Sequence, residues 1–216
     1  MQDQQNSLEA IQDIRRMMDR SSRFISLSGL SGIAAGVFAL AGAFWGGRTL
    51  NQYYDRYYKV EGYSGARFQD LKWELFLIAI GVLVAALVTA YYFTWRKAKA
   101  DRETLWNPTS RRLIINMMIP LVAGGVFVLS MLQFNEWRFV APSCLVFYGI
   151  ALVNGSKYTL GEVRYLGLSE LLLGLICAQP YFVGYGLYFW ALGFGWLHII
   201  YGIVMWIRYE KKGHQS

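Results

Sequence analysis

The sequence is poor in charged residues. Of its 216 residues, only 16% are Asp, Glu, Lys or Arg, whereas soluble domains average about 25%. The charges are also clustered and leave long uncharged blocks between them, which is typical of polytopic membrane proteins. The deficit therefore excludes an ordinary soluble domain and predicts an all-α, polytopic membrane helix bundle that forms one domain.

The residues that bind metals or act as nucleophiles are scarce as well. The two cysteines, Cys144 and Cys177, lie in apolar blocks without CxxC spacing, so they are expected to pack as small side chains. His198 is the one histidine inside an uncharged block, which excludes a haem held between two membrane histidines. A serine–histidine protease would need a serine near His198, and Ser169 is the candidate by depth.

Sequence motifs for catalysis are missing too. No uncharged block contains an aspartate, which excludes a protease with paired intramembrane aspartates. There is no P-loop, no H-E-x-x-H and no G-x-S-x-G. We therefore predict no metal site and no cofactor, and a membrane-embedded enzyme ranks last among the functions considered.

The longest uncharged block runs for 37 residues, from Leu171 to Ile207. A membrane-spanning helix needs only ~20 residues, so this block predicts two crossings, with a break at Gln179-Pro180. The same reading along the chain predicts six transmembrane helices, at about 24–47, 75–95, 113–134, 139–156, 160–178 and 184–208. Tyrosines at helical spacing after the first block (53, 54, 57 and 58) predict that its helix continues past the membrane surface.

The two ends of the chain are polar. Residues 1–22 carry Leu8, Ile11, Ile14 and Met18 at helical spacing beside arginines, which predicts an N-terminal amphipathic helix on the cytoplasmic membrane face. A helix that binds a partner protein is the alternative. Residues 209–216 form a polar cytoplasmic tail.

The distribution of Lys and Arg predicts the topology. With six spans, one side of the membrane receives 15 of these residues and the other side 6. The positive-inside rule then places both termini in the cytoplasm. The same rule explains the net charge of +7, so no nucleic-acid partner is predicted.

Small residues at helical spacing predict close contacts between helices. Ser28, Gly32 and Gly36 share one face of the first span. In the fifth span Gly167, Glu170, Gly174 and Cys177 form a stripe, and in the sixth Ala191, Gly195, His198 and Gly202 form another.

These stripes lead to a specific hypothesis about Glu170 and His198. Each lies ten residues, or ~15 Å, from the same membrane side, so the two side chains are expected to face each other. A carboxylate beside an imidazole favours charge on both groups, whereas burial disfavours it. Alternatively, the stripes face different helices and Glu170 bonds to Arg164 or to a hydroxyl.

Glu170 and His198 belong to a larger polar set in the inner half of the bundle. Its members are Asn116, Asn154, Glu162, Arg164, Glu170 and His198. Such residues form either a proton- or ion-linked site or hydrogen bonds that hold helices in register. The second role is favoured for the two asparagines. Glu162 and Arg164 lie near the headgroups and can snorkel, whereas the depth of Glu170 favours function.

Local capping signals predict two helix starts. The spacing Thr159-x-x-Glu162 is that of a capping box and predicts that the fifth helix begins near Leu160. After the break at Asn107-Pro108, either Thr109 or Ser110 is expected to cap the third helix.

Three stretches, SSRFISLSGLSG, LVNGSKYTLGEVRYLG and GFGWLHIIYGIVMWIRYE, resemble a family of uncharacterised bacterial six-span inner-membrane proteins. The resemblance implies the same topology and a bacterial inner membrane, and it carries no activity. The sequence alone favours a non-enzymatic scaffold, or an accessory or oligomeric subunit. The alternative is a small proton- or ion-linked transporter or channel built on Glu170 and His198. The expected partners are the lipid bilayer and either further copies of the chain or a membrane-complex partner.

Overall fold

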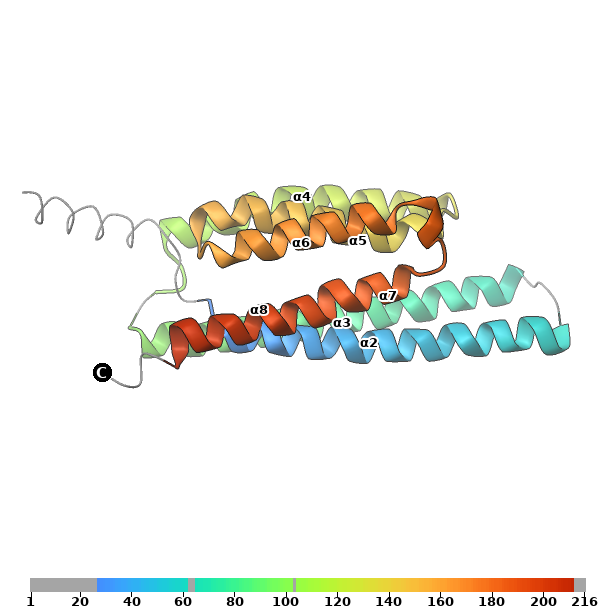
Figure 1. Ribbon diagram of the computed structural model, residues 1–216, viewed down its shortest axis with the longest axis horizontal. Coiled ribbons are helices and arrows are strands. Elements are labelled where there is room, and N and C mark those ends of the chain that lie inside the picture. Colours follow the sequence, from blue (N-terminus) through green and yellow to red (C-terminus); the bar gives the residue numbers. More distant parts are fainter. Residues whose placement is uncertain (1–26, 62–64, 103, 212–216) are drawn as a thin grey trace, which may run out of the picture.

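A computed structural model of the chain describes residues 27–61, 65–102 and 104–211. Every regular element within these ranges is helical (Figure 1). The all-α prediction is therefore confirmed for this part of the chain. The amphipathic helix predicted for residues 1–22 lies outside the described residues, as does most of the polar tail.

The chain forms a series of long helices joined by short turns. In chain order they are α2 (Gly29–Arg56), α3 (Gly65–Ala100), α4 (Pro108–Gln133), α5 (Val140–Gly155), α6 (Glu162–Cys177), α7 (Gly186–Trp190) and α8 (His198–Met205). Short 3₁₀- and π-helical elements extend or connect them: η1 (Tyr57–Glu61), η2 (Trp137–Phe139), η3 (Ser156–Tyr158), η4 (Pro180–Phe182), η5 (Ala191–Leu197) and η6 (Trp206–Glu210). The elements from α7 to η6 are continuous, and we call Gly186–Glu210 the C-terminal helix.

Five of these helices are long and apolar enough to cross a membrane. They are Gly29–Lys59, Gly65–Ala100, Pro108–Gln133, Trp137–Tyr158 and Gly186–Glu210. The chain is therefore a membrane protein by the length and composition of its helices. At 16 residues, α6 is about 24 Å long, which is shorter than the ~30 Å hydrocarbon core.

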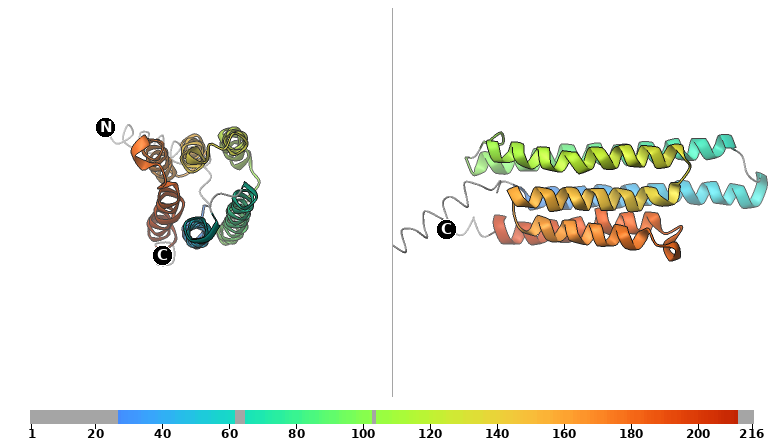
Figure 2. Two further views of the ribbon diagram at one scale, coloured as in Figure 1. Left: turned by 90° about the vertical axis from the view of Figure 1, so that its right-hand side faces the viewer. Right: turned by 90° about the horizontal axis from the view of Figure 1, so that it is seen from above.

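The helices lie in two layers, as the end-on view in Figure 2 shows. One layer contains α4, α5 and α6, and the other contains α3, α2 and the C-terminal helix (Figure 1). Within each layer, consecutive neighbours pack along their length. The C-terminal helix joins the layers, because it contacts α5 and α6 as well as α2.

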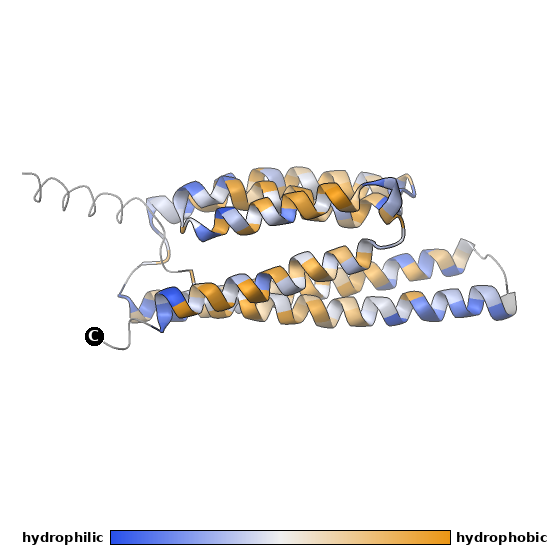
Figure 3. Cartoon of the chain, viewed as in Figure 1, coloured by the Kyte–Doolittle hydropathy of each residue, from blue (hydrophilic) through white to orange (hydrophobic). Residues whose placement is uncertain are grey.

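Hydropathy follows the long axis of the bundle. The middle of each layer is apolar and the ends are polar (Figure 3). At one end α2 and α3 extend beyond the other helices (Figure 1), and the described part of α2 continues through η1 to Glu61. The tyrosine spacing correctly predicted this continuation of the first helix.

Glycines bring neighbouring backbones together within each layer. A Cβ atom on Gly36 of α2 would lie 2.6 Å from the carbonyl oxygen of Gly195 in the C-terminal helix. One on Gly167 of α6 would lie 2.8 Å from the carbonyl oxygen of Gly149 in α5. The other small residues predicted at helix contacts behave alike: Gly32 and Gly202 face each other across the first of these contacts, and Gly174 faces α5. Ser28 instead precedes α2 as its N-cap residue.

Two helix starts can be compared with the capping predictions. The helix α6 begins at Glu162, two residues after Leu160, with Glu162 in its first turn as predicted and with Gly161 rather than Thr159 as the residue before the helix. Glu162 Oε1 binds the end of the C-terminal helix. At α4 the cap is Asn107 itself, whose Oδ1 accepts from the Ser110 N–H at 2.7 Å while Ser110 Oγ accepts from the Asn107 N–H. Ser110 therefore belongs to the cap as its partner.

Candidate functional site

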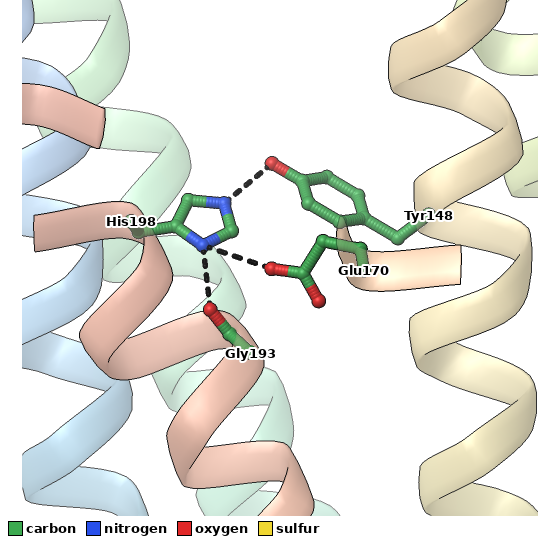
Figure 4. A network of polar contacts seen from close by, with 4 residues as sticks. All are labelled: Tyr148, Glu170, Gly193 and His198. Atoms are coloured by element: carbon green, nitrogen blue, oxygen red, sulfur yellow. Dashed lines mark hydrogen bonds and ion pairs between the residues drawn. The ribbon is translucent and has the colours of Figure 1, made fainter. Parts of the chain in front are cut away.

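Three polar side chains, two of them buried and one half-buried, meet between the two layers. They are Tyr148 of α5, Glu170 of α6 and His198 at the start of α8 (Figure 4). His198 Nδ1 lies 3.4 Å from Glu170 Oε1. On the other side of the ring, His198 Nε2 lies 2.8 Å from the Tyr148 hydroxyl. The structure thus brings together the two residues that the sequence places at equal depth, and adds a tyrosine.

A local change of helical winding positions His198. The residues before it, Ala191–Leu197, form a π-helix. Such turns are rare in proteins, and those that occur are often found at functional sites. His198 Nδ1 lies 3.0 Å from the carbonyl oxygen of Gly193, five residues earlier. The imidazole is therefore held from its own helix as well as from the opposite layer.

Gly193 also makes room for the carboxylate of Glu170. A Cβ atom at this position would lie 2.5 Å from Glu170 Oε2 and 2.5 Å from Leu145 Cδ2. No larger residue fits there without moving one of these groups. Glycine at position 193 is therefore part of the site.

The geometry fixes where the imidazole hydrogen lies. Nδ1 faces two oxygens, from Gly193 and Glu170, and a backbone carbonyl only accepts. Nδ1 therefore carries a hydrogen. The second nitrogen, Nε2, accepts from the Tyr148 hydroxyl when the ring is neutral and donates to it when the ring is protonated.

Glu170 is the most constrained member of the site. Its exposed fraction is 0%, and within the described part of the chain neither carboxylate oxygen has a hydrogen-bond partner. A buried carboxylate without such partners is costly, above all at membrane depth. Its polar neighbour is His198 Nδ1, and this contact is an ion pair when the imidazole is protonated. The described residues contain no group of three His, Cys, Asp or Glu suited to a metal ion.

The rest of the predicted polar set lies elsewhere. Glu162 Oε1 accepts from Arg208 and Tyr209 at the end of the C-terminal helix. Arg164 is exposed. Asn116 Nδ2 donates to the carbonyl of Arg112, so this bond stays within α4 and joins no helices.

Asn154 completes that set. It lies half-buried near the end of α5. Of the six polar residues singled out from the sequence, only Glu170 and His198 are joined to each other.

The stripes of small residues do not explain this meeting in the expected way. Gly167 and Gly174 face α5, while Gly195 and Gly202 face α2. The alternative stated above, that the two stripes face different helices, is therefore correct, although Glu170 bonds to neither Arg164 nor a hydroxyl. The two side chains meet because they reach across the seam between the layers.

Sequence reasoning missed two residues of the site, Tyr148 and Gly193. Tyr148 carried a signal, because it stands in the middle of a predicted span, whereas tyrosines favour the membrane interfaces. Gly193 carried a weaker signal, because it belongs to no stripe of small residues in the sequence. Only the π-helix brings it to the site.

The function must be argued from this geometry. The resemblance to a family of six-span bacterial proteins stays a prediction. Comparisons of the chain with protein-family models, with curated proteins and with solved structures find no match.

Proposed function

We propose that this chain is a small proton-linked membrane transporter, in which the charge state of Glu170 and His198 controls the contact between the two layers. One observation carries the proposal: a fully buried carboxylate, without hydrogen-bond partners in the described chain, lies beside an imidazole at the seam. Ionisable groups at membrane depth commonly serve proton relays and transport pathways.

The tight packing at Glu170 favours a proton over a larger ligand. Gly193 and Leu145 crowd the carboxylate, and two hollows of the described surface lie away from it at helix ends, around Trp106 and around Gln52. A proton fits at the seam without rearrangement. Its arrival or departure changes the buried charge by one, which changes the cost of keeping the layers closed. A solute would pass when the layers separate.

One observation supports the functions that the sequence alone favours, a scaffold or an accessory subunit. In the most apolar 18-residue stretch of α3 no residue is buried in the bundle, and this helix packs mainly on α2. Its remaining surface is available to lipid or to another subunit. Purification of the chain with a stoichiometric partner would favour this second candidate.

We also propose six spans, with both termini in the cytoplasm of a bacterial inner membrane. The charge asymmetry supports this topology, and several basic groups gather at one end of the bundle. Lys97 Nζ donates to the carbonyl of Leu27 there, at 2.8 Å. Reporter fusions after Gly65 and after Ser216 are expected on opposite sides of the membrane. Reporters on the same side would contradict six spans.

Proton flux in liposomes tests the proposed function. The wild-type protein is expected to dissipate an imposed pH gradient, and Glu170→Gln to lower the rate at least tenfold, because glutamine cannot exchange a proton. Glu136→Gln is the matched control, since Glu136 lies in the turn before α5, paired with Arg138 and half exposed. Equal rates for wild type and Glu170→Gln, with both proteins folded, would overturn the proposal.

A further inference from the structure

A row of polar side chains leads from the site toward one end of the bundle. Tyr148 contacts His198 Nε2. Tyr201 follows His198 by three residues and so lies on nearly the same face of the C-terminal helix. Glu162, which precedes Val163 at the start of α6, binds the Tyr209 hydroxyl of the C-terminal helix. Tyr148 and Tyr201 also pack against the same apolar cluster of Leu152, Val163 and Leu166.

The far end of this row reaches the surface. Glu162 Oε1 accepts from the Tyr209 hydroxyl at 2.8 Å and from Arg208 Nη1 at 2.7 Å. The exposed fraction is 16% for the Glu162 side chain and 63% for Arg208. A carboxylate that touches both water and the hydroxyl of the half-buried Tyr209 is suited to exchange protons with the solvent.

No comparable row leads the other way within the described residues. On the side of Gly193, the neighbours that a Cβ atom would meet besides Glu170 Oε2 are the apolar side chains of Leu145 and Leu173. On the opposite face of the C-terminal helix, α2 presents glycines rather than ionisable side chains. The titratable and charged groups near the route are therefore Tyr148 from α5, Glu162 and Glu170 from α6, and His198, Tyr201, Arg208 and Tyr209 from the C-terminal helix.

We infer that Glu162, Tyr209, Tyr201, Tyr148 and His198 form the path along which a proton passes between water and Glu170. This inference rests on the proposed proton-linked function. A proton from water first binds Glu162. Each hydroxyl then gives its hydrogen to the next group and takes one from the previous group, directly or through one water.

The last transfer runs through the imidazole. Nδ1 gives its hydrogen to Glu170 Oε1 while Nε2 takes one from Tyr148. His198 ends neutral with its hydrogen on Nε2, while Nδ1 accepts from the newly protonated Glu170. Each tyrosine regains its hydrogen, so the balance is one proton lost from water and one gained by Glu170. No oxidant, reductant or metal takes part.

The central link of this path, Tyr201, can be removed with little loss of packing. Tyr201→Phe deletes the hydroxyl and keeps the ring against the apolar cluster. The matched control is Tyr165→Phe on α6, because Tyr165 is 72% exposed. Tyr209→Phe provides a second variant at the surface end of the path if Tyr201→Phe does not fold.

The experiment follows protonation of Glu170 after a rapid pH jump in detergent micelles. Infrared spectroscopy detects the carboxyl band, and Glu170→Gln identifies it by its loss. We expect Tyr201→Phe to slow the appearance of the band at least tenfold while its final amplitude stays at the wild-type value. Tyr165→Phe is expected to match the wild type in both rate and amplitude. A purely structural tyrosine would not separate rate from amplitude in this way.

Three outcomes are distinguishable. A slowed band of full amplitude supports the path. A band in Tyr201→Phe, or in Tyr209→Phe, that appears as fast as in the wild type overturns the path and leaves the proposed function standing. A wild-type protein without any Glu170 band, across the pH range in which it stays folded, overturns the proposed function and the path with it.

Discussion

The contacts within the two layers differ in kind from the contacts between them. Within a layer, glycines let backbones touch, as where Gly36 of α2 meets Gly195 and where Gly167 of α6 meets Gly149. At the seam between layers, the long side chains of Glu170, His198 and Tyr148 meet instead. The first kind of contact has no room to adjust. The second depends on rotamers and on the position of a proton.

This difference indicates which parts of the molecule move together. Backbone contacts at van der Waals distance couple helices rigidly, because packed interiors resist deformation. Polar contacts between membrane helices average only about 0.6 kcal/mol each. We therefore expect each layer to behave as a unit and the seam to be the place where they separate. The predictions below test this distinction, beginning with the largest expected effect.

The first prediction concerns the contact within the layer of α2. Gly36→Leu is expected to lower the free energy of unfolding by about 3 kcal/mol or more, because the obstructing atoms include the backbone of the C-terminal helix. Unfolding in mixed detergent micelles, with gel filtration of the folded fraction, measures this loss. Gly81→Leu is the control, since nothing lies within 4 Å of a Cβ atom at Gly81. If Gly36→Leu were as stable as this control, the rigid contact would not exist.

The second prediction concerns the seam. Gly193→Ala places a methyl group on Glu170 Oε2 and Leu145 Cδ2, both of which are ends of flexible side chains. The cost of crowding, about 1–2 kcal/mol, is partly offset by the higher helix propensity of alanine, about 1 kcal/mol. The net change in stability is therefore small, whereas the carboxylate moves and its infrared band shifts.

Gly125→Ala is the matched control for this variant, because a Cβ atom at Gly125 meets nothing within 4 Å. It is expected to leave the Glu170 band unchanged. A Gly193→Ala protein with the wild-type band would show that the carboxylate does not lie against Gly193. A large loss of stability would show that the seam is packed as rigidly as the layers.

The sequence predicted the parts of this molecule that depend on composition and period. Uncharged blocks located the helices, and glycine spacing located the faces of close contact. The depth count predicted that Glu170 and His198 meet. It could do so because most of each counted interval is α-helical, Glu162–Glu170 in one helix and His198–Met205 in the other, with a rise of about 1.5 Å per residue.

The sequence could not predict features that depend on local winding or on which helices become neighbours. The π-helix before His198 changes the direction in which the following side chains point, and no periodic pattern encodes it. The sequence also did not show that Glu162 binds Arg208 and Tyr209, because these residues lie far along the chain. Tyr148 was missed because the membrane depth was counted only for ionisable side chains of the fifth and sixth spans, and Tyr148 lies in the fourth.

The last prediction is the smallest and measures the seam directly. A double-mutant cycle of Tyr148→Phe and His198→Phe isolates the hydrogen bond between the hydroxyl and Nε2. We expect a coupling free energy of about 0.6 kcal/mol, and no more than about 1.7 kcal/mol, because the partly unfolded protein in a membrane finds other partners for these groups. Unfolding in mixed micelles gives the four stabilities. The same cycle with Tyr188→Phe, at a position 73% exposed, should give no coupling. Zero coupling at Tyr148 would mean that the bond contributes nothing. A coupling as large as the loss caused by Gly36→Leu would remove the contrast between layer and seam, and with it the reason to expect the layers to separate there.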